Sequence, residues 1–474
     1  MDRTWRATAL HVAASLAAAA GMLPAGCQSY ERQSVELPQH RAAFLARTPD
    51  SPGVQQFAQE LAKAHEPSPA FDVSDGIDAS EAEVIALVFN ADLRMARMKA
   101  GVALASAENG ALWEDPVLGV DLQQVVQGAG ALEVLSMVRL TIPISGRLDL
   151  EKERLGAEYE AELARVAQEE WRVRIEVRRA WTEWTALEVQ LQTTRDFIAR
   201  IDALLDIVKV LEKAEELPRI ESRLFRIEHA TRSADAVLLE AKVREAALKL
   251  RQLMGLAPQA QVNLQRQGIG PAWPADREVL PPNMDDVGAH SPLMLVALAE
   301  YESSERTLAL EVRKQIPDLQ IGPGYGKLDG PDEFMMGISL PLPLLNANRQ
   351  AIAEARARRE VTRAAAQTAL ERLIATLAAA QVRLDAAKAL QATYENEVVP
   401  LVDLQYAETR RVAELGEVDT FVMLESLTRQ QDAKLDFIEV LRQRALARID
   451  IQEVTGPEWT APAPHTPAAK ENAK

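Results

Sequence analysis

Two short acidic segments carry the side chains of this 474-residue chain that could act directly on a ligand. The first is Glu215-Glu216-Leu217-Pro218, and the second is Glu414-Leu415-Gly416-Glu417, with Asp419 close behind. Each interrupts a long helical pattern, so each is expected to be an exposed turn. Carboxylates arranged as a ring around an opening favour cations and disfavour anions. The alternative is that these charges only keep an exposed turn soluble, and both interpretations stay open.

Histidine and glycine provide no catalytic or metal-binding pattern. The six histidines are scattered along the chain, and none belongs to a His-x-x-x-His or Glu-x-x-His set. We therefore expect no zinc site, no catalytic residues and no cofactor. Gly322, Gly324 and Gly326 alternate with other residues, but they lack the spacing and the following helix of a dinucleotide-binding fingerprint.

The single cysteine, Cys27, lies where a lipid anchor would be attached. Residues 1–26 begin with two arginines and an apolar stretch, and they are predicted to be a signal peptide. The segment Leu23-Pro24-Ala25-Gly26-Cys27 resembles a bacterial lipobox, in which the cysteine is lipidated; an ordinary signal peptide with an incidental cysteine is the alternative. Gln28 in the next position favours the outer membrane, by resemblance to bacterial lipoproteins. One cysteine also excludes an internal disulfide.

Composition favours long helices and disfavours two classes of partner. Ala, Leu, Glu and Arg are the most frequent residues, and aromatic residues make up only 5% of the chain, which is typical of coiled coils. The formal net charge of −17 disfavours nucleic acid and anionic membrane surfaces as partners. After the leader no run of about 18 apolar residues occurs, so no transmembrane helix is expected.

The chain also repeats itself. A segment of roughly 175 residues beginning near Glu81 returns about 200 positions later, and each copy carries two strand-like stretches between helices. Matching landmarks keep nearly the same offset: Asn90 with His290, Pro116 with Pro317, Glu216-Leu217-Pro218 with Glu414-Leu415-Gly416, and Gly255 with Gly456. Duplication of one structural unit is therefore expected, and it determines the fold.

This duplication sets the predicted domain boundaries. A lipidated N-terminal linker covers 27–80, and the two repeats cover 81–257 and 284–456. An inter-repeat linker covers 258–283, and the Pro/Ala/Lys-rich tail at 457–474 is predicted to be disordered.

Each repeat is predicted to contain one pair of β-strands. The first pair lies at about 117–126 and 132–142, and the second at about 318–327 and 333–340. Each stretch is roughly ten residues long, which is the length that a tilted strand needs to cross a bilayer. One face of each strand is apolar and the other polar, as in a barrel wall between lipid and water. A half-exposed soluble hairpin is the alternative.

A capped helix is predicted to open the first repeat. It covers about Ser80–Glu114, with Ser80 as the N-cap and Glu83 as the capping-box partner. Long helices with a 3.5-residue apolar period, typical of coiled coils, are expected to follow each strand pair and then return. Their ranges are about 147–215, Ala351 to beyond Pro400, 219–254 and 419–454.

A basic run lies on the first of these long helices. It alternates with glutamates, so we expect i,i+4 pairs such as Glu170 with Arg174 on a solvated helix face rather than a binding patch. Trp181 and Trp184 share one face of the same helix and are expected to pack in the core. The run consists of Arg172, Arg174, Arg178 and Arg179.

Two tandem repeats that each place a β-hairpin between long coiled-coil helices, behind a lipoprotein leader, resemble the TolC-like outer-membrane efflux protein family. The resemblance covers about residues 80–456. Its most specific parts are the strand-to-helix junctions at 140–147 and 338–349, the second of which is similar to the version in the heavy-metal branch. The stretch at 408–426 resembles the tip-and-return segment of the family, and Gly416 matches its glycine.

This resemblance implies a fold that is mainly α with a membrane β-barrel portion. Two tandem helix–β-hairpin–long-helix–helix repeats would build a trimeric twelve-stranded barrel, continued by an α-helical coiled-coil tunnel. Strand edges in lipid must be paired, which independently requires partners for a four-stranded sheet in a bilayer.

The same resemblance implies a passive outer-membrane exit duct, not an enzyme, within a tripartite efflux or type I secretion system. The partners would be two further copies in a homotrimer, outer-membrane lipid, a periplasmic adaptor (membrane fusion protein) and an inner-membrane pump. The acidic segments would form periplasmic tips that dock the adaptor and gate the tunnel. The alternative is a lipid-anchored periplasmic coiled-coil scaffold or adaptor without a pore, although known adaptors lack two equivalent repeats.

Overall fold

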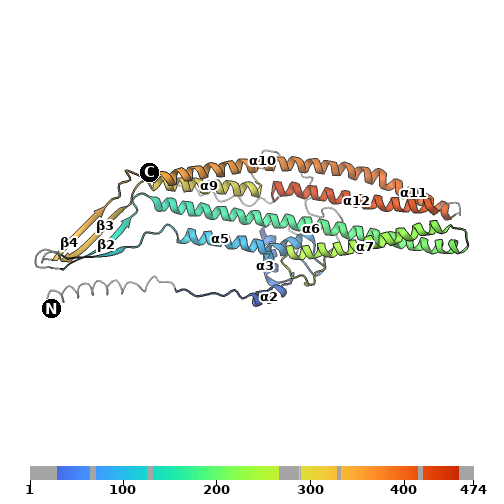
Figure 1. The fold of residues 1–474 in the computed structure, drawn as a ribbon, viewed down its shortest axis with the longest axis horizontal. Helices are drawn as coiled ribbons and strands as arrows, with labels where there is room; N and C mark the ends of the chain where they lie inside the picture. The colour runs from blue at the N-terminus through green and yellow to red at the C-terminus, as the bar shows by residue number, and fades with distance from the viewer. Residues whose placement is uncertain are drawn as a thin grey trace. The chain divides into compact units, whose positions relative to one another are not determined.

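The computed structural model describes residues 29–64, 71–124, 132–265, 288, 290–327, 332–414 and 420–457. These residues form α-helices and one four-stranded antiparallel sheet (Figure 1), so the expected mainly helical fold with a small sheet is confirmed. None of the helices within these ranges is both long enough and apolar enough to span a membrane. The chain divides into two compact units, and each unit takes segments from both sequence repeats.

The first unit contains the sheet and consists mainly of Lys99–Leu163 and Ala297–Ala366. Its strands pair in the order β1-β2-β3-β4 (Figure 1). They are β1 (Val117–Gln124), β2 (Leu132–Ile142), β3 (Leu319–Lys327) and β4 (Asp332–Ser339). All four overlap the predicted ranges. The predicted extension of the first strand to 126 and the turn expected at 127–130 lie outside the described residues, as does most of the turn expected at 328–332. Asp332 belongs to β4 instead.

Helices lead into and out of each strand pair. In chain order, α5 (Ala91–Asn109) precedes β1, α6 (Arg147–Lys213) follows β2, α9 (Pro292–Arg313) precedes β3, and α10 (Arg349–Thr393) follows β4. The same helix–strand–strand–helix order therefore occurs twice. The 67 residues of α6 form one uninterrupted helix, which at about 1.5 Å per residue is ~100 Å long.

The second unit contains the return helices and the main core. Its remaining elements are α2 (Leu37–Leu45), α3 (Pro52–Ala64), α4 (Ala79–Phe89), α7 (Arg219–Leu253), η2 (Tyr394–Val398), α11 (Val399–Glu414) and α12 (Thr420–Thr455). The helix after β4 continues past Pro400, as predicted, but it changes winding at the π-helical turn η2. Proline has no amide hydrogen for the carbonyl group of Asn396 and its ring crowds that group, so a wider turn just before Pro400 makes room.

The largest core lies where α4, α6 and α7 meet. Val173, Val177 and Trp184 follow the predicted apolar period of α6 and are buried there, and Trp181 is buried beside them. The two tryptophan rings meet edge to face, with 5.4 Å between their centroids. Their expected role in packing is therefore confirmed.

Part of the segment predicted as a linker before the first repeat belongs to this core. Val54 and Ile77 are buried in it, and Ile77 forms a parallel bridge with Leu264. Arg47 donates a hydrogen bond to the carbonyl oxygen of Gly255 at 2.8 Å. Helix α3 and the residues around Ile77 are thus packed against the first repeat, whereas residues 29–36 are exposed and outside any helix or strand. Helix α2, which has no buried residue, was not predicted.

The predicted opening helix is wrong in its start, its end and its continuity. The N-cap is Asp78, whose side chain accepts from the backbone of Glu81, and the Glu81 carboxylate accepts from the backbone of Asp78. This capping box lies two residues before the predicted one, because an ionised aspartate is also a strong cap. At the other end, α5 stops at Asn109, and Ala111 adopts a left-handed φ of 55°.

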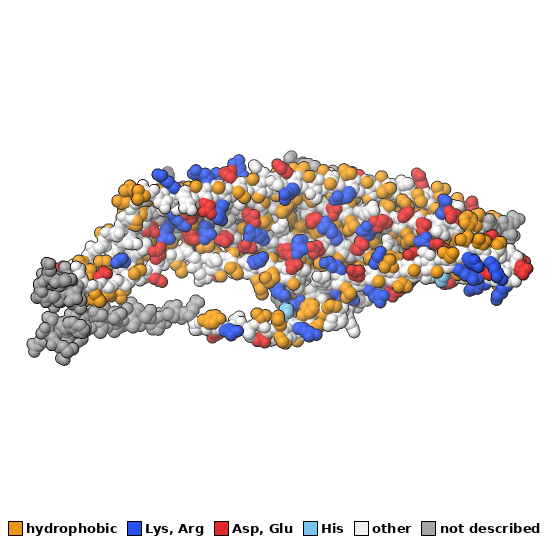
Figure 2. All heavy atoms as spheres, viewed as in Figure 1, with side chains coloured by type: hydrophobic (Ala, Val, Ile, Leu, Met, Phe, Trp, Pro, Cys, Tyr) orange, Lys and Arg blue, Asp and Glu red, His pale blue; other side chains and the backbone are white. Residues whose placement is uncertain are grey.

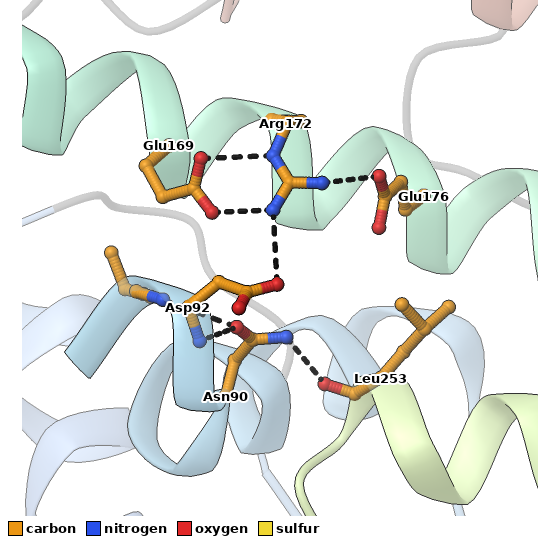
Figure 3. Close-up of polar contacts among 7 residues, drawn as sticks. Asn90, Asp92, Glu169, Arg172, Glu176 and Leu253 are labelled. Atoms are coloured by element: carbon orange, nitrogen blue, oxygen red, sulfur yellow. Dashed lines mark hydrogen bonds and ion pairs between the residues drawn. The ribbon is translucent and has the colours of Figure 1, made fainter. Parts of the chain in front are cut away.

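A single buried asparagine divides this segment into two helices. Asn90 ends α4, its side-chain oxygen accepts from the backbone nitrogens of Asp92 and Leu93, and its amide donates to the carbonyl oxygen of Leu253 at 3.0 Å (Figure 3). One side chain therefore starts α5 and also holds the end of α7. Such bonds compete with helix continuation.

Two glycines show that the repeats pack in the same way. Gly255 and Gly456 follow α7 and α12 with φ of 65° and 87°. A methyl group on Gly255 would lie 2.3 Å from the carbonyl oxygen of Phe89, and one on Gly456 would lie 2.4 Å from that of His290. Both glycines thus permit the same close backbone approach at positions about 200 residues apart.

Candidate channel wall and helical tip

The strand register separates the sheet's side chains into two faces. By register, nearly every position on one face is apolar, and the exceptions are Gln124, Ser136 and the Lys327–Asp332 pair. Phe334 and Ile338 on this face are each 72% exposed. Its apolar members are Leu118, Val120, Leu122, Val134, Val138, Leu140, Ile142, Leu319, Ile321, Pro323, Tyr325, Phe334, Met336 and Ile338.

The opposite face combines polar residues and glycines with four apolar residues, which are Val117, Leu135, Met137 and Met335. Asp121, Arg139, Thr141 and Gln320 belong to it. The Met137 side chain lies across the glycines of β3 there, and a methyl group on Gly322 would come within 3.2 Å of its Cγ atom. These glycines therefore allow the Met137 side chain to approach the β3 backbone closely.

An ion cluster fixes the junction between the sheet and α6. Arg147, the first residue of α6, pairs with Asp318 just before β3 and, at 2.8 Å, with Glu114 ahead of β1. Ser145 donates a hydrogen bond to the same Asp318 carboxylate at 2.9 Å. Arg147 thereby links the residues just before β1 in the first repeat to those just before β3 in the second.

The first acidic segment forms a tight turn between α6 and α7. Glu215 adopts a left-handed φ of 61°, a conformation that glycine usually supplies at a helix end. Pro218 does not end α6 directly, because α6 stops at Lys213 and Pro218 instead precedes α7 as its N-cap residue. Glu215 and Glu216 are exposed, whereas Leu217 is buried.

Leu217 anchors this turn in a separate apolar cluster. It packs with Phe197, Ile201, Leu205, Val208, Phe225 and Leu427, which come from α6, α7 and α12. The turn is therefore fixed to the helices rather than free. The buried leucine explains how two exposed glutamates can be held in defined positions.

Sequence reasoning missed the polar residues that surround the turn. The Glu212 carboxylate accepts from Arg226 at 2.6 Å and from the hydroxyl group of Ser222 at 2.5 Å. The Ser222 hydrogen bond and Arg226, with Arg219 and Arg223 nearby, lower the pKa of Glu212 below its usual range. Figure 2 shows Lys and Arg side chains gathered at the end of the α6–α7 hairpin, so this tip carries both signs of charge.

The second acidic segment is only partly described. Glu414 is the last residue of α11, and Leu415, Gly416, Glu417 and Asp419 lie outside the described residues, as does Cys27. Immediately beyond the gap, the hydroxyl group of Thr420 donates to the carboxylate of Glu221 at 2.6 Å. The starts of α12 and α7 are thus joined, which places the return helices of the two repeats together.

Helix α7 carries two rows of residues with coiled-coil spacing, which we call its seams. The first seam, which includes Phe225, Val243 and Leu250, is buried against the rest of the chain. The second has the same alternating spacing but faces outward: Ile220 is 72% exposed, Ile227 60% and Leu238 56%. Nine exposed positions follow this spacing: 220, 224, 227, 231, 234, 238, 241, 245 and 248; all are apolar except Thr231 and Glu245. A helix with two seams is suited to packing between two neighbours.

The basic run on α6 is not the solvated face that we predicted. Arg174 and Arg178 both pair with the buried Glu83 carboxylate at 2.7 Å, and Arg178 also donates to Gln452 of α12 at 2.9 Å. Burial would raise the pKa of Glu83, but the two arginines hold it below its usual value. The predicted partner of Arg174, Glu170, pairs instead with Arg97.

Arg172 does follow the predicted pattern on the surface. It pairs with Glu169 and Glu176 on its own helix and reaches Asp92 of α5 at 3.3 Å (Figure 3). These ion pairs are structural. Among the described residues, no group of three or more His, Cys, Asp or Glu side chains is arranged to hold a metal ion.

The comparisons with known proteins identify the fold. The sequence matches no family model and no curated protein. The structure is similar to that of CusC, whose solved structures concern folding and transmembrane channel formation, with a TM-score of 0.65 and 14% identity over 90% of this chain and 99% of CusC.

Two further outer-membrane proteins give similar values. VceC from Vibrio cholerae has a TM-score of 0.65 and 14% identity, covering 80% of this chain and 96% of VceC. The open MtrE outer-membrane channel of Neisseria gonorrhoeae has a TM-score of 0.63 and 14% identity, covering 83% of this chain and 94% of MtrE. The resemblance inferred from the strand-to-helix junctions is therefore confirmed at the level of structure, and the chain has the fold of the TolC-like outer-membrane channels.

Proposed function

We propose that this chain is the outer-membrane exit duct of a tripartite efflux or type I secretion system. It would conduct substrate passively and catalyse no reaction. The observation that carries the proposal is the sheet with one apolar and one polar face. Such a sheet is suited to a wall between lipid and a water-filled lumen.

Closure of the wall requires more than one copy. Strands β1 and β4 form the outer edges of the sheet, and within the described part of the chain each has one side without a pairing strand. Lipid cannot satisfy these backbone groups, so the edges must pair with other copies. Three copies would give a closed barrel of twelve strands with the polar face inside, and the exposed seam of α7 would pack against a neighbouring helix.

The tips would dock a periplasmic adaptor that links the duct to an inner-membrane pump. The first tip exposes Glu215 and Glu216. Arg219, Arg223 and Arg226 follow in about the first two turns of α7. Mixed charges in fixed positions favour recognition of a protein surface over selection of cations. We therefore propose docking and gating as the role of the tips, and lipid anchoring as the role of Cys27.

The scaffold alternative has less physical support. A lipid-anchored protein without a pore would leave the whole apolar face of the sheet in water. Exposed apolar patches of this extent mark membrane or protein contacts in stable proteins.

Adjacent residues on opposite faces provide the test. Leu122→Lys places a charge on the apolar face, which costs about 2–4 kcal/mol near the bilayer midplane, whereas Gln123→Lys places it on the polar face. We expect the Gln123 variant to fractionate with outer membranes, resist carbonate extraction and form conducting pores in planar bilayers. We expect the Leu122 variant to fail in all three assays. Equal behaviour of both variants, or a parent protein released by carbonate, would refute the proposal.

A further inference from the structure

Both outer edges of the sheet display apolar side chains at the end where the helices join. Ahead of β1, Leu112 is 70% exposed and Trp113 57%. Beyond β4, Leu342 is 70% exposed, Leu344 78% and Leu345 94%. We call these the β1-edge patch and the β4-edge patch. Both lie in the first structural unit.

The local backbone conformation keeps each patch exposed. Pro341 and Pro343 favour extended backbone in the residues before them, and the backbone nitrogen of Leu344 donates to the carbonyl oxygen of Leu342 at 2.9 Å. On the other edge, the left-handed Ala111 redirects the chain after α5. Neither patch has a covering element among the described residues of its own chain.

The strand register brings the two patches to the same end of the sheet. Val117 at the start of β1 pairs with Arg139 near the end of β2, and Gln320 near the start of β3 pairs with Ser339 at the end of β4. Thus β1 leaves the helix-side end of the sheet and β4 returns to it. If β1 of a second copy extends the sheet antiparallel to β4, the start of that β1 lies at the same end as the end of β4. The residues ahead of that β1 then lie beside those beyond β4.

We propose that Leu112 and Trp113 of one copy pack on Leu342, Leu344 and Leu345 of the next copy. This head-to-tail apolar contact would close the ring at the base of the sheet. The inference rests on the proposed function, because it assumes that copies pair β4 to β1. It adds the particular side chains that seal each junction and predicts that one aromatic residue is central to assembly.

A second copy fits these patches better than lipid does. Each patch is bordered by polar groups: Glu114 next to Trp113 pairs with Arg147, and Asn348 beyond Leu345 donates to the carbonyl oxygen of Glu311 at 2.8 Å. An apolar patch with a polar rim is typical of a protein contact. Ile144 at the same end is also exposed, so contact of the whole row with lipid is the competing outcome.

Paired cysteines test the contact in the full-length protein. The parent has only Cys27, so Trp113→Cys and Leu345→Cys can be introduced singly and together. A short bis-maleimide reagent is added to isolated outer membranes. We expect covalent dimers and trimers only from the double variant, because each link joins the β1 edge of one copy to the β4 edge of another. Cross-linking of the Trp113→Cys variant alone would indicate symmetric β1–β1 pairing and overturn the proposal.

Two further measurements separate the possible failures. An amine-reactive cross-linker reports whether trimers exist at all. If trimers form but the double-cysteine variant gives no thiol link, the contact is wrong and the exit-duct proposal stands; if no trimers form, both fail. A polarity-sensitive probe on Leu345→Cys that is quenched by lipid-phase quenchers would also overturn the contact.

In detergent, Trp113→Ala should raise the dissociation constant of the assembly by about tenfold or more, whereas Glu108→Ala, on the exposed surface of α5, should leave it unchanged.

Discussion

Replacing Glu83 by glutamine would break the most deeply buried ion cluster of the second unit. The Glu83 side chain is 6% exposed, and those of its partners Arg178 and Arg174 are 9% and 15% exposed. The substitution keeps the size of the side chain and one hydrogen-bond acceptor. It removes the negative charge that compensates two arginines away from water.

The expected cost follows from this burial. Removing one partner of a buried ion pair costs about 3–5 kcal/mol, because the remaining charge is left uncompensated. Since glutamine still accepts one hydrogen bond, we expect about 3 kcal/mol. Glu170→Gln is the matched control: it breaks the pair with Arg97, whose side chains are 40% and 39% exposed, and should cost less than about 1 kcal/mol.

Hydrogen exchange of the α4 backbone amides is a suitable assay, because a large membrane assembly unfolds irreversibly on heating. A loss of about 3 kcal/mol corresponds to exchange that is roughly a hundredfold faster, and the Glu170 variant should stay within about fivefold of the parent. Equal protection of α4 in the Glu83 and Glu170 variants would refute the reasoning.

The pH dependence adds a second test. Because the pKa of Glu83 is lowered on folding, its stabilisation is complete above the unfolded pKa near 4.5 and is lost as pH falls through the folded pKa. The parent should therefore lose this protection on acidification, and Glu83→Gln should not.

Four other substitutions test three separate parts of the structure. Gly255→Ala and Gly456→Ala should each destabilise the fold by at least about 1–2 kcal/mol, as measured by denaturant unfolding, because each glycine has positive φ and closely approaches a carbonyl group; Gly53→Ala, which meets no atom within 4 Å, is the tolerated control. Glu215→Gly should leave stability unchanged or raise it by up to about 1 kcal/mol, because it relieves a left-handed glutamate; a clear loss would contradict the turn geometry. Ile227→Glu on the exposed seam of α7 should reduce trimer recovery in cross-linking without loss of helical circular dichroism, whereas Glu228→Gln should not; unchanged recovery would show that this seam has no partner in the assembly.

The helices and strands that have a regular apolar period were predictable from the sequence. The apolar seam from Val173 onward and the alternation in β2 were sufficient to place α6 and the sheet, because many residues contribute to each signal. The break at Asn90 was missed because one asparagine is tolerated within a helical pattern. Its effect depends on the carbonyl group of Leu253, 163 positions away. The buried role of Glu83 was missed for the same reason: its partners come from another helix.

The candidate tip was only partly predictable. Proline and a run of glutamates identified the turn at 215–218, but charge alone suggested that every residue there was exposed. Leu217 is instead buried with side chains from three helices. The hydrogen bonds of Glu212 with Ser222 and Arg226 join residues 10 and 14 positions apart across the turn, a spacing with no local sequence signal. The apolar residues before β1 and after β4 could be read from the sequence, but only the strand register shows that they lie at the same end of the sheet.

The central claim is that copies of this chain close into one duct, and single-particle electron imaging of the detergent-purified full-length protein tests it most directly. The account predicts a particle with three-fold symmetry in which the three sheets form one closed ring, with β4 of each copy paired to β1 of the next and no free strand edge. A monomer or dimer with an open four-stranded sheet would contradict it and would favour the pore-free scaffold.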